Sequence, residues 1–341
     1  SAGILREYKV KKIFLTFFIS VFFVSLNAKQ SEFRIAKQYG LSYLPLIVLE
    51  EQKLIEKNAK KAGLGDIKIL WVTFGGGASA NDALLSNSVD LISNGAAPFL
   101  RLWDKTKGKV KAICALDRSH IVLNSSNPRI KTLKDFTDKD KIALPSAKVS
   151  LSALILQIAA AKEFGIKNYD KLDSLSVTLK HPDALIALTS GKSEITAHVA
   201  TEPFITLEQQ NKNVHEVFSS NDLVEGGFSL NLISATEKFY SENREFITVF
   251  LNSLHEADIW IKNNKKEAAK LYVKAAKSKE SVDLIEKILN SPNVDYDINP
   301  LNVTVFGDFL HEIGAIKSKP KEKELFFDTI FETDELGPDC H

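Results

Sequence analysis

The feature that most constrains this 341-residue chain is the segment 71–100, WVTFGGGASANDALLSNSVDLISNGAAPFL. An apolar, β-prone run (71–74) meets three consecutive glycines (75–77) and then a helical pattern. A second strand at 89–93 and a second small-residue turn at 94–98 lead into another helix. Such a turn places backbone N–H groups and the positive end of a helix dipole at the sheet edge. Two successive units of this kind predict a small-ligand cleft along the carboxyl edge of a parallel sheet.

The glycine loop also satisfies the loose dinucleotide fingerprint G-x-G-x-x-G/A through Gly75, Gly77 and Ala80. That fingerprint needs an acid at the end of the next strand, where it would hold a ribose hydroxyl. Here Asp90 begins the strand and Asn94 ends it. We therefore expect no dinucleotide. The alternative to a ligand loop is a glycine turn that only packs a helix onto the sheet.

Ser79 stands where the first of these helices is expected to begin, so we predict that it caps the helix or contacts a ligand. A nucleophilic role would need G-x-S-x-G, and residues 77–81, GASAN, lack the final glycine. The seven histidines are dispersed, with no H-x-x-x-H or C-x-x-C spacing for a metal. The sequence thus predicts no catalytic group, no metal and no cofactor.

Charge and the N-terminal segment indicate a compartment. The net charge is +1 and the basic residues are dispersed, so the patch that nucleic-acid binding requires is missing. Lys11 and Lys12 precede an apolar run, 13–26, which ends at Asn27-Ala28. This order is typical of a signal peptide, and the run is short of the roughly 20 residues of a membrane span. We expect cleavage after Ala28 and a periplasmic protein without a lipid anchor; an uncleaved anchor is the alternative.

Beyond this segment, strands and helices alternate as in an α/β fold with mostly parallel sheets. Extended crossings near residues 122 and 232 join two similar halves, which implies a two-lobed, hinged protein with two crossovers. The expected division is 1–28 for leader and signal peptide, 29–125 for the first part of lobe 1, 126–232 for lobe 2, and 233–341 for the second, mainly helical part of lobe 1.

Four segments occur in an order that resembles ABC-importer solute-binding proteins of the nitrate/sulfonate/taurine type. They are 75–100, quoted above, IKTLKDFTDKDKIALPSAKVS at 130–150, HPDALIALTSGKSEITAHVATEPF at 181–204, and FGDFLHEIGAIKSKP at 306–320. The resemblance covers essentially residues 31–330. It implies the type II periplasmic-binding fold, a small-molecule solute between two lobes, and delivery to an inner-membrane ABC permease and its ATPase. It also implies a monomer that performs no covalent chemistry.

The expected ligand site lies among the loops after residues 40, 74, 93, 145, 180 and 200. The candidate ligand-binding residues are Ser42, Tyr43, Gly76, Gly77, Ser79, Asn94, Gly95, Ala96, Ser146, Val149, Ser150, His198, Thr201 and Glu202. Helix N-termini at Ser79, Ala96 and Ser150 favour a small anion or a zwitterion.

Individual roles stay open for three of the polar residues. Glu202 either meets a ligand amine, giving an aminosulfonate-like preference, or caps the next helix. His198 is either a donor in the cleft or an ordinary strand histidine, and His181 is expected to cap a helix before Pro182. The alternatives for the whole chain are an enzyme of the menaquinone-pathway or pyrimidine-synthesis type on the same fold, or a binder of a neutral aromatic or pyrimidine ligand.

Overall fold

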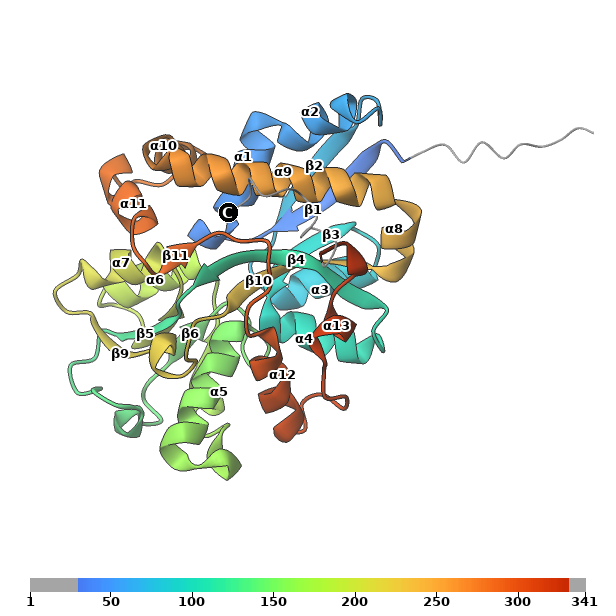
Figure 1. Cartoon of the computed structure of the whole chain (residues 1–341). Helices are drawn as coiled ribbons and strands as arrows, with labels where there is room; N and C mark the ends of the chain where they lie inside the picture. Colours follow the sequence, from blue (N-terminus) through green and yellow to red (C-terminus); the bar gives the residue numbers. More distant parts are fainter. Residues whose placement is uncertain (1–29, 331–341) are drawn as a thin grey trace, which may run out of the picture. The chain divides into compact units, whose positions relative to one another are not determined.

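Two mixed β-sheets flanked by helices organise the computed structural model, which describes residues 30–330 (Figure 1). The first sheet has the order β11-β4-β10-β3-β1-β2 and the second the order β7-β6-β8-β5-β9. The first sheet comprises β1 (Glu32–Lys37), β2 (Lys68–Thr73), β3 (Leu91–Gly95), β4 (Val110–Ser119), β10 (Ser229–Thr236) and β11 (Val294–Asp295). The second comprises β5 (Val122–Ser125), β6 (Ile142–Leu144), β7 (Ser176–Thr178), β8 (Ala197–Ala200) and β9 (His215–Ser219). The expected α/β class is confirmed.

The helices connect and cover these strands. They are α1 (Leu44–Gln52), α2 (Leu54–Lys61), α3 (Gly77–Leu85), α4 (Ala96–Lys105), α5 (Leu151–Phe164), α6 (His181–Thr189), α7 (Phe204–Gln209), α8 (Glu237–Glu242), α9 (Arg244–Asn263), α10 (Lys265–Ala275), α11 (Val282–Leu289), α12 (Val303–Glu312) and α13 (Glu322–Leu325). In the described part of the chain, none of these helices combines the length and apolarity needed to cross a membrane. The expected signal peptide, with its apolar run 13–26, lies outside the described residues.

Each sheet has three parallel strands at one side. β1 pairs in parallel with β2 and β3, and β6 pairs in parallel with β7 and β8. β10 inserts antiparallel between β3 and β4, while β5 lies antiparallel between β8 and β9. Because parallel strands end at the same edge, the loops after β1, β2 and β3 meet at one side of their sheet.

The chain changes sheets at positions that differ from the expected lobe boundaries. It leaves the first sheet after β4 and enters the second at Val122, so β5 belongs to the second sheet. It returns between Ser219 and Ser229, so all of β10 belongs to the first. The boundary at 125 assigns the whole of β5 to the wrong sheet and the boundary at 232 cuts β10, because extended sequence alone does not reveal which sheet a strand joins. Movement of two lobes as separate bodies stays a prediction.

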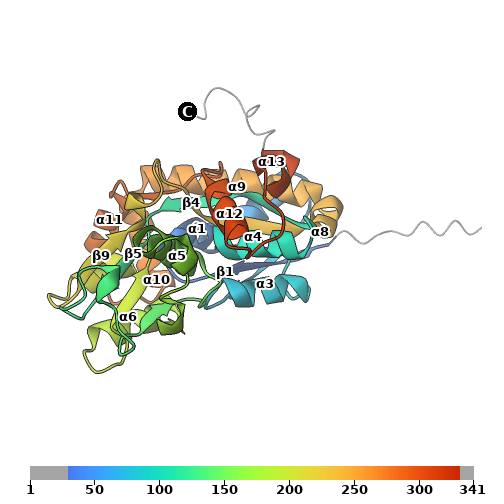
Figure 2. The same ribbon diagram turned by 90° about the horizontal axis from the view of Figure 1, so that it is seen from below.

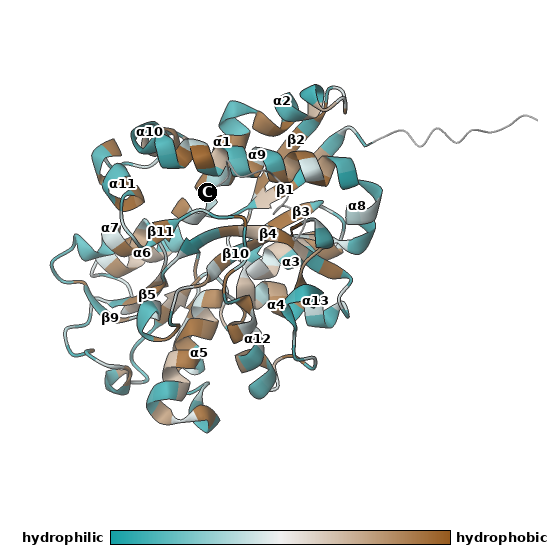
Figure 3. Cartoon of the chain, in the orientation of Figure 1, coloured by the Kyte–Doolittle hydropathy of each residue, from teal (hydrophilic) through white to brown (hydrophobic). Residues whose placement is uncertain are grey.

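Apolar burial holds the helices to the sheets. α9 buries Phe246, Phe250 and Leu254 on one face and packs against α1 and α2 (Figure 1). The ring of Phe246 stacks on Phe33 of β1 with centroids 3.6 Å apart. α5 is buried along most of its length, and Figure 3 shows it mostly brown. α4 contacts both α12 and α5, which lie near it in Figure 2, so a helix of the first sheet contacts one of the second.

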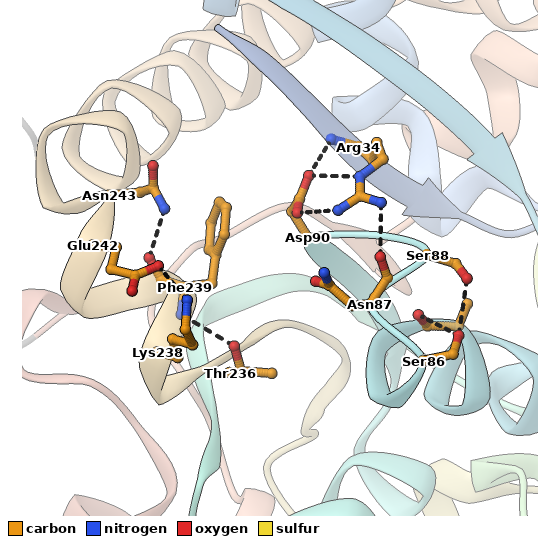
Figure 4. A network of polar contacts seen from close by, with 11 residues as sticks. Arg34, Ser86, Asn87, Ser88, Asp90, Thr236, Lys238, Phe239, Glu242 and Asn243 are labelled. Atoms are coloured by element: carbon orange, nitrogen blue, oxygen red, sulfur yellow. Dashed lines mark hydrogen bonds and ion pairs between the residues drawn. The ribbon is translucent and has the colours of Figure 1, made fainter. Parts of the chain in front are cut away.

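An ion pair fixes the starts of β1 and β3 to each other (Figure 4). The Asp90 carboxylate accepts from the backbone N–H of Arg34 at 2.7 Å and from its guanidinium at 2.8 and 3.1 Å. Asp90 is 4% exposed. The acid that fails the dinucleotide pattern therefore serves the opposite end of the strand, where it satisfies a strand N–H and a partly buried cation.

Asp90→Asn is expected to lower the free energy of unfolding by about 1–3 kcal/mol, because it removes charge-assisted hydrogen bonds from a buried position. Urea denaturation followed by circular dichroism measures the change. The matched control is Glu242→Gln, whose partner Lys238 is exposed (Figure 4) and whose loss should change stability by less than about 0.5 kcal/mol. Equal effects of the two substitutions would contradict this account.

Candidate functional site: a closed cavity at the helix N-termini

A cavity of about 40 Å³ lies where loops of the first sheet face loops of the second. From the first sheet it is lined by Gln38, Tyr39, Ser42, Tyr43, Gly75, Gly77, Gly95 and Pro98, and on the β10 side by Leu230 and Asn231. The crossover and second sheet contribute Ile121, Pro145, Ser150, Leu151, Ser152, His181 and Thr201. The volume has room for only a few water molecules, so a solute enclosed there is small.

Four helices begin at this cavity. α3 starts at Gly77, α4 starts after Gly95, and α5 starts after Ser150, whose hydroxyl accepts from the N–H of Ala153 at 3.1 Å. α6 starts at His181, which lines the wall from the second sheet. The N–H of Ala153 is bonded to Ser150 and that of Asp183 to the Lys180 carbonyl, while the other first-turn N–H groups and the helix dipoles add positive potential. The cavity is therefore suited to negative charge.

Six of the fourteen candidate residues line the cavity, and eight do not. Those that line it are Ser42, Tyr43, Gly77, Gly95, Ser150 and Thr201; those that lie outside the wall are Gly76, Ser79, Asn94, Ala96, Ser146, Val149, His198 and Glu202. The loops predicted from the sequence are thus the loops that meet at the cavity. Which residue of each loop lines the cavity was less predictable.

Ser79 does not cap α3 as expected. The N-cap is Gly76, three residues earlier, where the lack of a side chain at Gly76 and Gly77 leaves room for Pro145 and Pro98. The Ser79 hydroxyl donates to the Gly76 carbonyl at 2.8 Å. It therefore has an intrahelical role and lies outside the cavity wall.

The sequence left two roles open for Glu202, a ligand contact or a helix cap, and its contacts are those of a helix cap. Its carboxylate accepts from the N–H of Thr206 at 3.2 Å and from the Thr206 hydroxyl at 3.0 Å. Burial raises the pKa of Glu202, while these hydrogen bonds act in the opposite direction. The carboxylate is thus engaged at the start of α7.

His181, and not His198, is the histidine that lines the cavity. His181 lines the cavity, and Lys180 rather than His181 is the N-cap of α6. His198 is fully buried in β8, directly behind His181. The sequence places His198 on a strand near the cleft. Because successive strand side chains point to opposite faces of the sheet, it does not show whether His198 or another residue reaches the cavity.

Sequence reasoning missed Asn231, a polar residue of the cavity wall, and its hydrogen-bond partner Asp117. Asn231 lines the cavity from β10, and its side chain accepts from the Tyr43 hydroxyl at 2.9 Å. Its backbone N–H and its amide both donate to Asp117 Oδ1, at 3.1 and 3.0 Å. The available signal was the buried Asn in an otherwise apolar strand, since a buried amide needs partners.

Asp117 lies behind Asn231, outside the cavity wall, and is 1% exposed. Burial raises the pKa of Asp117 to about 7, although the hydrogen bonds from Asn231 oppose the shift. The ordinary aspartate pKa in an unfolded chain is about 3.9. Because the folded pKa is the higher one, ionisation opposes folding, and the contribution of Asp117 to stability is lost as pH rises from about 4 towards 7.

Asp117→Asn is expected to raise the free energy of unfolding at pH 8 by roughly 2–4 kcal/mol and less at pH 5, because the amide keeps the acceptor but cannot ionise. Urea denaturation at both pH values measures this difference. Asp66→Asn, at an exposed acid, is the control and should give no pH-dependent gain. A gain that is equal at pH 5 and pH 8 would rule out burial of the charge as its cause.

The cavity walls are already in contact on both sides of the opening. The Leu41 N–H donates to the Glu202 carbonyl at 2.9 Å, which joins the first-sheet loop to the second. Gly76 approaches the loop after β6 so closely that a Cβ would come 2.5 Å from the Pro145 carbonyl oxygen and also overlap Ser146 Oγ. At Gly75 the nearest atom to such a Cβ is 3.6 Å away, which is an ordinary contact.

Gly76→Ala is therefore expected to hold the two loops apart, with a larger radius of gyration than wild type in small-angle X-ray scattering. Gly76 has an extended backbone that any residue adopts, so the effect is a steric one across the opening. Gly75→Ala is the matched control and should leave the scattering unchanged. Identical curves for both variants and wild type would show that this contact does not limit closure.

Comparison with known proteins gives the fold. No family model matches the chain, and no curated protein matches its sequence. The solved aliphatic sulphonate-binding protein SsuA of Escherichia coli is similar, with 20% identity, a TM-score of 0.65, and coverage of 89% of this chain and 99% of that one. The alkanesulfonate-binding SsuA of Xanthomonas axonopodis bound to MOPS has 17% identity and a TM-score of 0.67, covering 89% and 98%.

The periplasmic nitrate-binding protein NrtA of Synechocystis is a further structural relative, with 13% identity and a TM-score of 0.69 over 92% of this chain and 91% of that one. The match extends over nearly the whole of each chain, and so includes both sheets and both crossovers. The chain therefore has the fold of the periplasmic solute-binding proteins of ABC importers.

Proposed function

We propose that this protein is the solute-binding component of an ABC importer and that it encloses a small anion between its two sheets. The convergence of four helix N-termini on one cavity carries the proposal. Those N–H groups hold negative charge without a basic side chain. The structural relatives named for sulfonate and nitrate binding support the same class of ligand.

The charge of the residues that line the cavity narrows the class of possible ligands. No arginine or lysine is among the residues that line the cavity, so a bidentate clamp for a multiply charged anion is missing from that wall. Glu202, which would have received a ligand amine, is turned to Thr206. These two observations favour a singly charged oxyanion, such as nitrate or a small alkanesulfonate, over an aminosulfonate.

The transport role follows from closure. A solute that contacts loops of both sheets only when they are together favours the closed state through its differential affinity. We place the protein in the periplasm, where the closed form would deliver its solute to a membrane permease and its ATPase. The monomeric state and the absence of covalent chemistry belong to the same proposal. The alternative hypothesis is an enzyme of the menaquinone-pathway or pyrimidine-synthesis type on the same fold.

Isothermal titration calorimetry against nitrate, ethanesulfonate, taurine and uracil tests the ligand class. We expect nitrate or ethanesulfonate to bind most tightly and uracil to bind weakly. Ser152→Ala should weaken the tightest anion by about three- to tenfold, because Ser152 lines the cavity in the first turn of α5 and offers a hydroxyl.

Ser86→Ala is the matched control, since Ser86 is exposed at the far end of α3 and should not affect binding. Tight binding of uracil that is insensitive to Ser152→Ala would overturn the anion proposal and leave a binding protein for a neutral ligand. Conversion of any bound compound, followed by NMR of the solution after incubation, would instead favour the enzyme.

A further inference from the structure

Behind the cavity wall, three buried side chains form a chain of hydrogen bonds. His181 Nδ1 lies 2.8 Å from His198 Nε2, and His198 Nδ1 contacts Glu208 Oε1. Glu208 Oε2 accepts from the Asn124 amide at 2.8 Å. The chain therefore runs from the cavity surface at α6, through β8, to a carboxylate on α7.

Charge compensation sets the protonation of the inner pair. Glu208 and His198 are both 0% exposed, and an uncompensated carboxylate at such a position is expensive. His198 is in direct contact with that carboxylate and, as an imidazolium, makes the pair neutral overall. The remaining oxygen of Glu208 is satisfied by the neutral Asn124 amide, so the pair is also fully hydrogen-bonded.

The protonation of His198 dictates the tautomer of His181. An imidazolium donates from both nitrogens, so His198 donates through Nδ1 to Glu208 and through Nε2 to His181. His181 Nδ1 must then accept, which leaves the hydrogen of the neutral ring on Nε2. Burial lowers the pKa of His181 well below its usual value, and the positive charge on His198 adds to the shift, so the ring stays neutral.

The ring of His181 is also held in place. It stacks on Phe204 with centroids 5.4 Å apart and an interplanar angle of 18°. Because Nδ1 is turned towards His198, Nε2 is the ring nitrogen that remains for a solute in the cavity that His181 lines.

We propose that the Nε2–H of His181 is a donor for the anionic solute, positioned by the buried pair of His198 and Glu208. The anion in this statement rests on the proposed function, whereas the positioning does not. Loss of the proton from His198 would move the His181 hydrogen to Nδ1 and turn Nε2 into an acceptor, which repels an anion.

Other titratable groups near this chain come from each element packed against it. Glu202 lies before α7, Lys180 and Asp183 pair at the start of α6, and Tyr39 approaches from the first sheet, where Lys180 Nζ lies 5.7 Å from its ring. Glu216 of β9 contacts Gln209, which in turn donates to Asn124. Repulsion from Glu208 adds to burial in raising the pKa of Glu202.

NMR of protein labelled with ¹⁵N at histidine reads these states without any ligand. At pH 7 we expect His198 to be doubly protonated and His181 to be neutral with hydrogen on Nε2. Glu208→Gln should make His198 neutral and shift the His181 hydrogen to Nδ1. His215, whose Nε2 donates to the Ile130 carbonyl, is an internal reference that should not change.

Glu242→Gln is the matched control, because the same chemical change at an exposed acid outside this network should leave both histidines as in wild type. A neutral His198 in wild type, or a His181 hydrogen on Nδ1, would overturn the proposal even if Glu208→Gln fails to fold. A His181 tautomer that is unchanged in folded Glu208→Gln would overturn it as well.

Calorimetry with nitrate and ethanesulfonate tests the binding role. His181→Ala should weaken the tighter of the two anions at least about tenfold at pH 7, as expected for a hydrogen bond to a charged group. If wild type binds an anion and His181→Ala binds it equally well, this inference fails and the proposed function stands. If wild type binds neither anion, the proposed function and the donor role of His181 fail together, whatever the tautomers are.

Discussion

The parallel pairing of β1 with β2 and β3 is the constraint on which the site depends. It brings the carboxyl ends of three strands to one edge, so the helices that follow begin beside one another. The ion pair of Arg34 and Asp90 anchors the opposite ends of β1 and β3. The second sheet repeats this arrangement with β6, β7 and β8, and α5 and α6 begin at the facing edge. A cavity lined by helix N-termini on both sides is thus a consequence of strand direction.

Sequence reasoning recovered what depends on local pattern. The glycine loop after 74, the second turn at 94–98 and the helix beginning after Ser150 are local features, and each lies at the cavity. Roles that depend on a partner elsewhere in the chain were not recoverable. Ser79 is displaced by the choice of Gly76 as N-cap, and Glu202 is engaged by Thr206 one turn later. The expected lobe boundaries failed for the same reason, because the sheet that a strand joins is a long-range property.

Buried ionisable groups around the cavity show two ways of meeting the cost of burial. Glu208 lies in contact with His198 and accepts from Asn124, so both of its oxygens have hydrogen-bond partners. Asp117 instead has a raised pKa, because Asn231 offers it hydrogen bonds but no positive charge. Asp258 of α9 is a more extreme case: burial raises its pKa well above the usual value, and neither of its oxygens has a hydrogen-bond partner among the described residues. These differences follow from the neighbours and not from the depth of burial alone.

Under the proposed function, recognition of an anion by neutral donors would require the opening to exclude water. Backbone N–H groups, hydroxyls and a neutral imidazole each carry only partial charge, so their attraction for an anion is weak while water competes. Excluding water lowers the local dielectric and strengthens every one of these contacts. Close approach at Gly76 and the hydrogen bond from Leu41 to Glu202 provide that exclusion. A wall with arginine would bind an anion in the open state as well; a wall of dipoles gains most of its affinity on closure, which makes the closed state the one that reports a bound solute.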